Sequence, residues 1–304
     1  MGYNPVMIFK GAVMKVIWMA VLSFLTLQAM EPAVSGKWLI EHQNDPHLVV
    51  VDVSPSTAYM TGHVPGAIRS GIEKWRRRKD AHAVEVKSVT DLQEEMRRLG
   101  IDANSSVVVY SHHLNNKDVL KATYVLWAME YAGLKNTALL DGGLPAYEAA
   151  DGNLSTAVAI DRYGSFTAEA NRSVLATIEE VNASVGKTAM IDSRPADFYF
   201  GAVKQKTLAR SGHISYATSY FWRYSLDADR KLKPLGTLSK MIEAGLGFDK
   251  TRPLIVYCTG GLEASMNYFV FHRLLGFDRA RLYDASMKEW ANRSDTPMTS
   301  YRWE

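Results

Sequence analysis

The residues best suited to chemistry lie around Cys258, the chain's one cysteine. Residues 254–257 are wholly apolar, which is typical of a buried strand in a parallel sheet. Apolar residues recur at helical spacing from 262 to 275, so Cys258 is expected on a tight loop between a strand and a helix. Gly260 and Gly261 let such a loop curl until backbone N–H groups converge on the sulfur. This arrangement favours a thiolate and predicts nucleophilic chemistry.

The alternative is that Cys258 is an inert buried side chain, as lone cysteines more often are. The glycine pair after it and the strand–loop–helix setting favour a reactive role instead. A single cysteine excludes an internal disulfide and any site built from several cysteines. Nothing else in the sequence implies a metal or an organic cofactor.

Length and charge narrow the class of protein. A chain of 304 residues fits two domains of ordinary size. The net charge of +3 is mild, and no basic stripe with interleaved aromatic residues is present, so nucleic acid is not an expected partner. The densest positive cluster, residues 75–79, is predicted to be a solvated helix or loop.

From about residue 35 the chain repeats itself, which is its strongest architectural signal. Apolar runs end in Asp52 in the first half and in Asp192 in the second. Further matches join Gly62-His63 to Gly212-His213, residues 106–111 to 254–258, and 140–143 to 283–286. Helical stretches, expected at 90–99, 119–131, 178–185 and 238–244, alternate with the strands. The chain is thus predicted to be α/β, with a parallel sheet covered by helices on both faces in each half and sites at the carboxyl ends of strands.

Cys258 and its loop, with Leu275-Gly-Phe277, Leu282-Tyr-Asp284 and Ser286-Met-Lys-Glu-Trp290, resemble the active half of a tandem-domain rhodanese. These proteins are thiosulfate or 3-mercaptopyruvate sulfurtransferases. The resemblance implies two rhodanese-like domains, an inactive one at 35–152 and a catalytic one at 172–304, joined by a polar linker at 153–171. It also implies a Cys258 persulfide, a small-molecule sulfur donor, and a thiol or cyanide as acceptor.

The same resemblance suggests the residues around the sulfur. Asp192-Ser-Arg194 is similar to the family's Asp-x-Arg, whose arginine helps hold the anionic donor, with Asp192 in support. The bland alternative is that Arg194 only pairs with Asp192. The expected donor-binding residues are Arg194, Thr259, Gly260, Gly261, Leu262 and Glu263.

Two features of the loop depart from the family pattern. Thr259 and Gly260 stand where thiosulfate-using rhodaneses typically carry basic residues, and Glu263 stands where threonine, arginine or lysine is more usual. An acidic side chain should repel a dianion and raise the pKa of the cysteine. Alternatively, Glu263 stabilises a helix N-terminus. Thiosulfate is accordingly a less favoured donor.

The first-half counterpart of the cysteine loop begins Ser111-His112-His113 and has neither cysteine nor glycine. It cannot form a persulfide, and the resemblance implies that this half is inactive and helps to wall the cleft. The neighbouring histidines suggest a hydrolase or a metal site. We expect them instead to be surface polar residues, since no acidic orienting residue is evident.

Two other functions compete with sulfur transfer. A phosphatase of this fold would carry an arginine six positions after the cysteine, but that position is Ala264. A non-catalytic persulfide carrier, sensor or binding scaffold would explain the altered loop. A depressed pKa of Cys258 would favour catalysis, and a pKa near the free value of ~8.5 would favour the scaffold.

Residues 1–30 are expected to be a signal peptide or, less favoured, an uncleaved membrane anchor. Lys10 and Lys15 precede an apolar stretch at 16–27 that is shorter than the ~20 residues of a membrane span. Leu27 makes the following cleavage signal poor, and Met14 is an alternative start. We expect a monomer that is periplasmic or otherwise exported.

Overall fold

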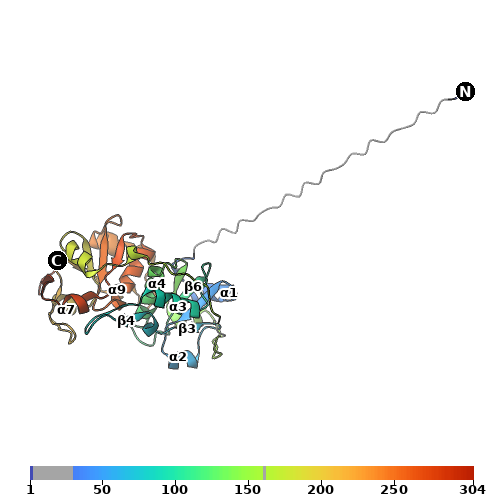
Figure 1. The fold of residues 1–304 in the computed structure, drawn as a ribbon, viewed down its shortest axis with the longest axis horizontal. Coiled ribbons are helices and arrows are strands. Elements are labelled where there is room, and N and C mark those ends of the chain that lie inside the picture. The colour runs from blue at the N-terminus through green and yellow to red at the C-terminus, as the bar shows by residue number, and fades with distance from the viewer. Residues whose placement is uncertain (3–29, 160–161) are drawn as a thin grey trace.

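The computed structural model describes residues 1–2, 30–159 and 162–304, so the expected signal peptide lies almost wholly outside the described residues. The two halves of the chain form adjacent lobes, blue to green and yellow to red in Figure 1. The strands are β1 (Ala33–Val34), β2 (Leu48–Asp52), β3 (Ile68–Arg69), β4 (Arg76–Arg78), β5 (Val84–Val86), β6 (Ser106–Tyr110), β7 (Thr137–Leu140), β8 (Ala189–Asp192), β9 (His213–Ile214), β10 (Thr218–Ser219), β11 (Leu254–Tyr257), β12 (Ala280–Leu282) and β13 (Met298–Thr299).

The α-helices are shorter in the second half than in the first. They are α1 (Gly36–His42), α2 (Ser56–Thr61), α3 (Val89–Arg98), α4 (Val119–Tyr131), α5 (Gly143–Glu148), α6 (Ile178–Ser184), α7 (Ala196–Phe200), α8 (Leu235–Ser239), α9 (Leu262–Tyr268) and α10 (Ser286–Trp290). Helices α8 and α9 continue as the π-helical segments η4 (Lys240–Ala244) and η5 (Phe269–Leu274).

Each half contains one parallel sheet, as the repeat predicts. The strand order is β1-β7-β6-β2-β3 in the first half and β10-β8-β11-β12 in the second. In the corresponding central pairs, Asp52 lies opposite Tyr110 and Asp192 lies opposite Tyr257. The two aspartates and the loops that follow β6 and β11 therefore sit at the carboxyl edges of their sheets.

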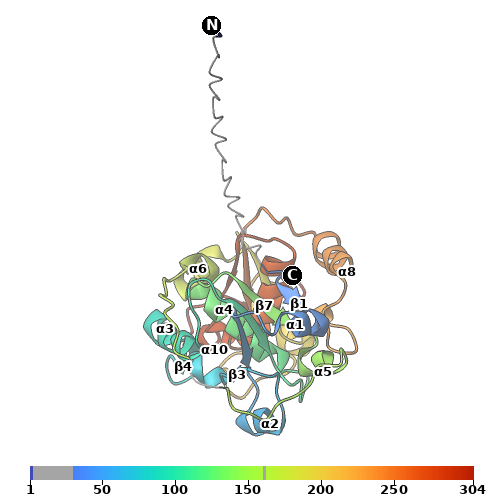
Figure 2. The same cartoon turned by 90° about the vertical axis from the view of Figure 1, so that its right-hand side faces the viewer.

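Both sheets are buried on both faces because successive strand residues point to opposite sides. In β11, Leu254 and Val256 join the large core that includes α9, whereas Ile255 and Tyr257 join a second core with α6 and α10. In the first lobe, α4 lies on one side of β7, and α1 and α5 lie on the other (Figure 2). The prediction of parallel sheets with helices on both faces is confirmed.

The two halves share one continuous apolar core through the packing of α4 on α9. Side-chain hydrogen bonds between the two halves reinforce this packing. The Thr123 and Ser265 hydroxyls lie 2.8 Å apart, and the Tyr268 hydroxyl donates to Glu130 at 3.1 Å. The first half is thereby held against α9, the helix that follows the cysteine loop.

Between the halves, the described part of residues 153–171 packs on the first lobe. Ser155 pairs with His63, and the backbone N–H of Phe166 donates to the Ile101 carbonyl. Over the ranges that the structure describes, no helix is long and apolar enough to span a bilayer.

Candidate active site

Cys258 follows β11 directly and lies at the start of the loop that leads into α9, as predicted. The backbone N–H of Gly260 donates to its Sγ at 3.4 Å, and the Cys258 N–H donates to the Ser286 hydroxyl at 3.1 Å. Gly261 has a φ of +87°, and a Cβ at this position would clash with the Asp284 carboxylate. The loop therefore needs glycine at 261 to curl around the sulfur.

The electrostatics of the loop differ from the prediction of a favoured thiolate. Burial raises the pKa of the Cys258 thiol to about 11, and the nearby Glu263 carboxylate adds to the rise. The N–H groups of Ala264, Gly260 and Glu263 act in the opposite direction but do not outweigh burial. The expectation of a favoured thiolate is not met, because Cys258 is almost wholly enclosed.

A cavity of about 610 Å³ opens beside Cys258 between the two halves. Its walls are formed by Arg76, Asn115, Lys117, Asp118, Leu120, Lys121, Phe198, Val203, Lys204, Gln205, Lys206, Thr259, Gly260, Leu262, Glu263 and Lys288. Four of the predicted loop residues line it, and Gly261 does not. A volume of this size accommodates a small-molecule substrate.

The cavity walls are strongly basic, which the residues next to Cys258 in sequence do not reveal. Glu263 pairs with Lys117 at 3.3 Å, and Asp118 pairs with Lys121 at 2.9 Å. The other four lining cations are Arg76, Lys204, Lys206 and Lys288. They give the cavity a net positive charge suited to an anionic ligand.

Arg194 is not a wall of this cavity. Its side chain is 1% exposed, and its guanidinium bonds both Asp192 oxygens, the shortest contact being 2.5 Å, and the Gly212 carbonyl. These partners hold the guanidinium below the surface of the cavity, and a role for Arg194 in binding the donor stays a prediction. Asp192 lies opposite Tyr257, the residue before Cys258, and binds the Arg194 guanidinium.

The cluster at 75–79 contains a strand where the sequence predicts a helix or loop, and only residues 77–79 are solvated as predicted. Trp75 is fully buried, and β4 pairs with β5 in an antiparallel ribbon that reaches the second half. There Arg76 donates to the Gly260 carbonyl, and the Val86 N–H donates to Asp284 at 2.5 Å. Alternation along β4 could have indicated that one arginine of the run points inward.

The first-half loop also differs from expectation. His112 and His113 are buried rather than on the surface, and Asp52 is the acidic partner of His112, at 2.7 Å. Burial and the Arg230 guanidinium lower the pKa of His113 to about 4. The Ser111 hydroxyl has no hydrogen-bond partner within the described residues, so no histidine is placed to activate it.

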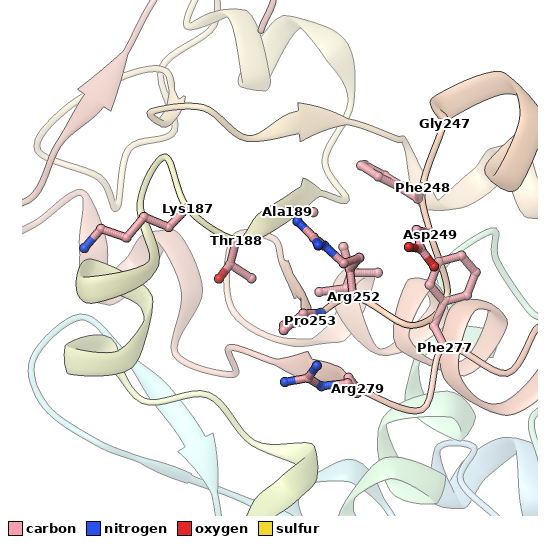
Figure 3. A pocket seen from close by; sticks show the side chains of 11 residues that line it. Lys187, Thr188, Ala189, Gly247, Phe248, Asp249, Arg252, Pro253, Phe277 and Arg279 are labelled. Atoms are coloured by element: carbon pink, nitrogen blue, oxygen red, sulfur yellow. The ribbon is translucent and has the colours of Figure 1, made fainter.

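A second cavity, of about 560 Å³, lies at the opposite edge of the second sheet (Figure 3). It is bounded by the first residues of β8 and β11, with Lys187, Arg252 and Arg279 around its rim. It contains no nucleophile comparable to Cys258. In the part of the chain that the structure describes, no cluster of histidine, cysteine and acidic residues could hold a metal ion.

Two segments of the chain match a known protein family. A family model described as the rhodanese-like domain matches residues 35–150 and again 177–293. The chain belongs to the rhodanese family. The resemblance read from the cysteine loop and the internal repeat is thus confirmed.

Its relatives are similar over most of their length. A putative thiosulfate sulfurtransferase of Synechococcus elongatus is 32% identical, over 87% of this chain and 84% of that protein. The sulfur carrier protein TtuD of Thermus thermophilus is 30% identical over 88% and 96%. Escherichia coli 3-mercaptopyruvate sulfurtransferase is 27% identical over 87% and 96%. The names of these rhodaneses agree with the prediction of a sulfurtransferase.

The solved structures show the same fold. The crystal structure of SseA from Escherichia coli, described as a 3-mercaptopyruvate sulfurtransferase with the rhodanese fold, superposes with a TM-score of 0.73 at 24% identity, covering 84% of this chain and 99% of that one. The tandem arrangement of two rhodanese-like domains is therefore shared along the whole of that chain.

Proposed function

We propose that this rhodanese is a sulfurtransferase that carries sulfur as a persulfide on Cys258. The observation that supports it best is the position of the chain's only cysteine, on a glycine loop beside a basic cavity of about 610 Å³. The names of its relatives point to the same chemistry.

The reaction has two transfers. The deprotonated Cys258 sulfur attacks the outer sulfur of the donor, a Cys–S–S⁻ persulfide forms, and the bond from that sulfur to the donor breaks. The departing group keeps the electron pair, so thiosulfate would leave as sulfite and 3-mercaptopyruvate as the enolate of pyruvate. A thiol or cyanide then attacks the outer persulfide sulfur and restores the Cys258 thiolate. The Gly260 N–H that contacts Sγ would stabilise the thiolate at both stages.

The chain's own residues favour an anionic donor. Four cavity cations have no ion pair within the cavity wall, and desolvation inside the cavity strengthens their attraction for an anion. A bound anion also leaves less water around Cys258. Thiosulfate is therefore a better candidate than the residues after Cys258 suggest.

A second candidate function is a non-catalytic persulfide carrier, sensor or scaffold. The raised pKa of Cys258 favours it, since few molecules carry a thiolate near neutral pH. The similarity to a protein named as a sulfur carrier also fits. Counting thiocyanate released per chain, with thiosulfate and cyanide in excess, separates the two. Many turnovers support the enzyme, and a single equivalent per chain supports the carrier.

We also propose that the chain is exported. The support is the apolar stretch at residues 16–27, which Lys10 and Lys15 precede. Expression with and without residues 1–30, followed by fractionation, tests export, and the mass of the mature chain locates cleavage. Retention of the full-length chain in the cytoplasm would refute it.

A further inference from the structure

We propose that Arg76 of the first half and Lys288 of α10 together form the anion-binding site for the sulfur donor. The inference rests on the proposed sulfurtransferase function and names the residues that recognise its substrate. It makes the first half a contributor to the active site, rather than only a wall of the cleft.

Arg76 reaches the cysteine loop from the other half of the molecule. Its guanidinium donates to the Gly260 carbonyl, lies over the Tyr124 ring at 4.6 Å from the centroid, and stands 4.0 Å from the Asp284 carboxylate. The side chain is only 13% exposed, yet it lines the cavity beside Cys258. Its buried Nε has no hydrogen-bond partner among the described residues. A buried N–H group without a partner is best satisfied by an acceptor atom of a bound ligand.

Lys288 approaches the same loop from another side. Its backbone N–H donates to the Thr259 carbonyl at 2.9 Å. Its Cδ lies 3.3 Å from the point that a Cβ on Gly260 would occupy. Within the described residues its ammonium group has no hydrogen-bond or ion-pair partner. Glycine at 260 therefore leaves room for Lys288 against the loop while Arg76 holds its carbonyl.

The two side chains supply charge that the loop lacks. Thr259 and Gly260 are neutral, and the nearest loop charge is the Glu263 carboxylate, which is already paired with Lys117. Arg76 and Lys288 put two cations around Gly260, the residue whose N–H contacts the sulfur. The ligand that fits is a small oxyanion whose reactive atom points at Cys258, as the sulfonate end of thiosulfate would allow.

Alkylation of Cys258 tests this site directly. Iodoacetate and iodoacetamide attack the same sulfur but differ in charge, so the ratio of their rates reports anion attraction and cancels the thiolate fraction. Cys258 is the only cysteine, so the modification is unambiguous. We expect the ratio to fall about tenfold in Arg76→Met and severalfold in Lys288→Met.

Two substitutions serve as matched controls. Arg77 follows Arg76 but is 55% exposed and paired with Glu85, and Lys240 is an exposed lysine outside the cavity. Arg77→Met and Lys240→Met should keep the wild-type ratio. In the Arg76 and Lys288 variants, the KM for thiosulfate should rise more than kcat falls.

The proposal is overturned if folded Arg76→Met and Lys288→Met both keep the wild-type ratio. Thermal unfolding reports whether each variant is folded. Should Arg76→Met fail to fold, Lys288→Met decides alone, because it leaves the contacts of Arg76 in place. The ratio requires no sulfur transfer, so it can fall as expected even if Cys258 never gains sulfur, an outcome that would refute only the proposed function.

Discussion

Replacing Glu263 by glutamine should make Cys258 more acidic. The substitution removes the carboxylate charge that, after burial, contributes most to the raised pKa of Cys258, and it keeps the size of the side chain. A pKa of about 11 leaves about one thiolate in 10⁴ molecules at pH 7. A nearby charge typically shifts a pKa by about one to three units. Here the Lys117 ammonium group offsets part of the effect that the Glu263 carboxylate has on the pKa of Cys258.

We therefore expect the pKa of Cys258 to fall from about 11 to about 10 in Glu263→Gln. The pH profile of the iodoacetamide rate, followed by intact mass, measures it directly. Alkylation at pH 7 should become about tenfold faster, because each pKa unit changes the thiolate fraction tenfold. Glu243→Gln removes a half-buried carboxylate of the same half that pairs with Lys250, and it should leave the pKa of Cys258 unchanged. An unchanged or higher midpoint in Glu263→Gln would refute the electrostatic reasoning.

Three further predictions concern stability and the first half. Burial raises the pKa of Asp284 to about 6 from 3.8, so its contribution to stability is full below about pH 4 and is lost as the pH rises through about 6, a change of about 3 kcal/mol. Urea unfolding should show that the free energy of unfolding of Asp284→Asn, relative to that of the wild type, rises by this amount between pH 4 and pH 8. Parallel dependences of the two free energies on pH would contradict this prediction. Gly261→Ala should lower the free energy of unfolding by about 2 kcal/mol or more, because φ is +87° and the added Cβ meets Asp284. In Gly260→Ala the added Cβ meets only the flexible Lys288 side chain, so urea unfolding should show a smaller loss. Ser111→Ala should change the activation free energy of sulfur transfer and the free energy of unfolding by no more than about 0.5 kcal/mol, since the Ser111 hydroxyl bonds nothing among the described residues. A large loss of activity would mean that the first-half loop takes part in the reaction.

Much of the fold could be predicted from periodicity. β11 and α4 have the bounds that the apolar patterns indicate, because a fully buried strand and a long apolar helix leave few alternatives. The helix at 262–275 is instead divided into α9 and the π-helical η5. Apolar spacing does not distinguish these hydrogen-bond patterns.

The site was less predictable because its charges come from distant segments. Cys258 and its glycines are contiguous, so their geometry could be predicted from the loop alone. Arg76 reaches the cavity on the β4–β5 ribbon and Lys117 from the loop before α4, and no local pattern encodes how the two halves pack together. Arg194 has the residue type that binds anions, but its Nε and Nη2 atoms donate to the neighbouring Asp192 and the Gly212 carbonyl. Burial also outweighed the loop N–H groups at Cys258, and its depth depends on the whole fold.

The most direct test of sulfur transfer is the intact mass of the purified protein before and after incubation with thiosulfate or, separately, 3-mercaptopyruvate. We predict a gain of one sulfur that cyanide removes, and no gain in Cys258→Ala. The gain should be larger with the donor that the cavity prefers, and turnover with that donor should release thiocyanate repeatedly. A wild-type chain that gains no sulfur from either donor, while its Cys258 still reacts with iodoacetamide, would contradict the proposed persulfide chemistry.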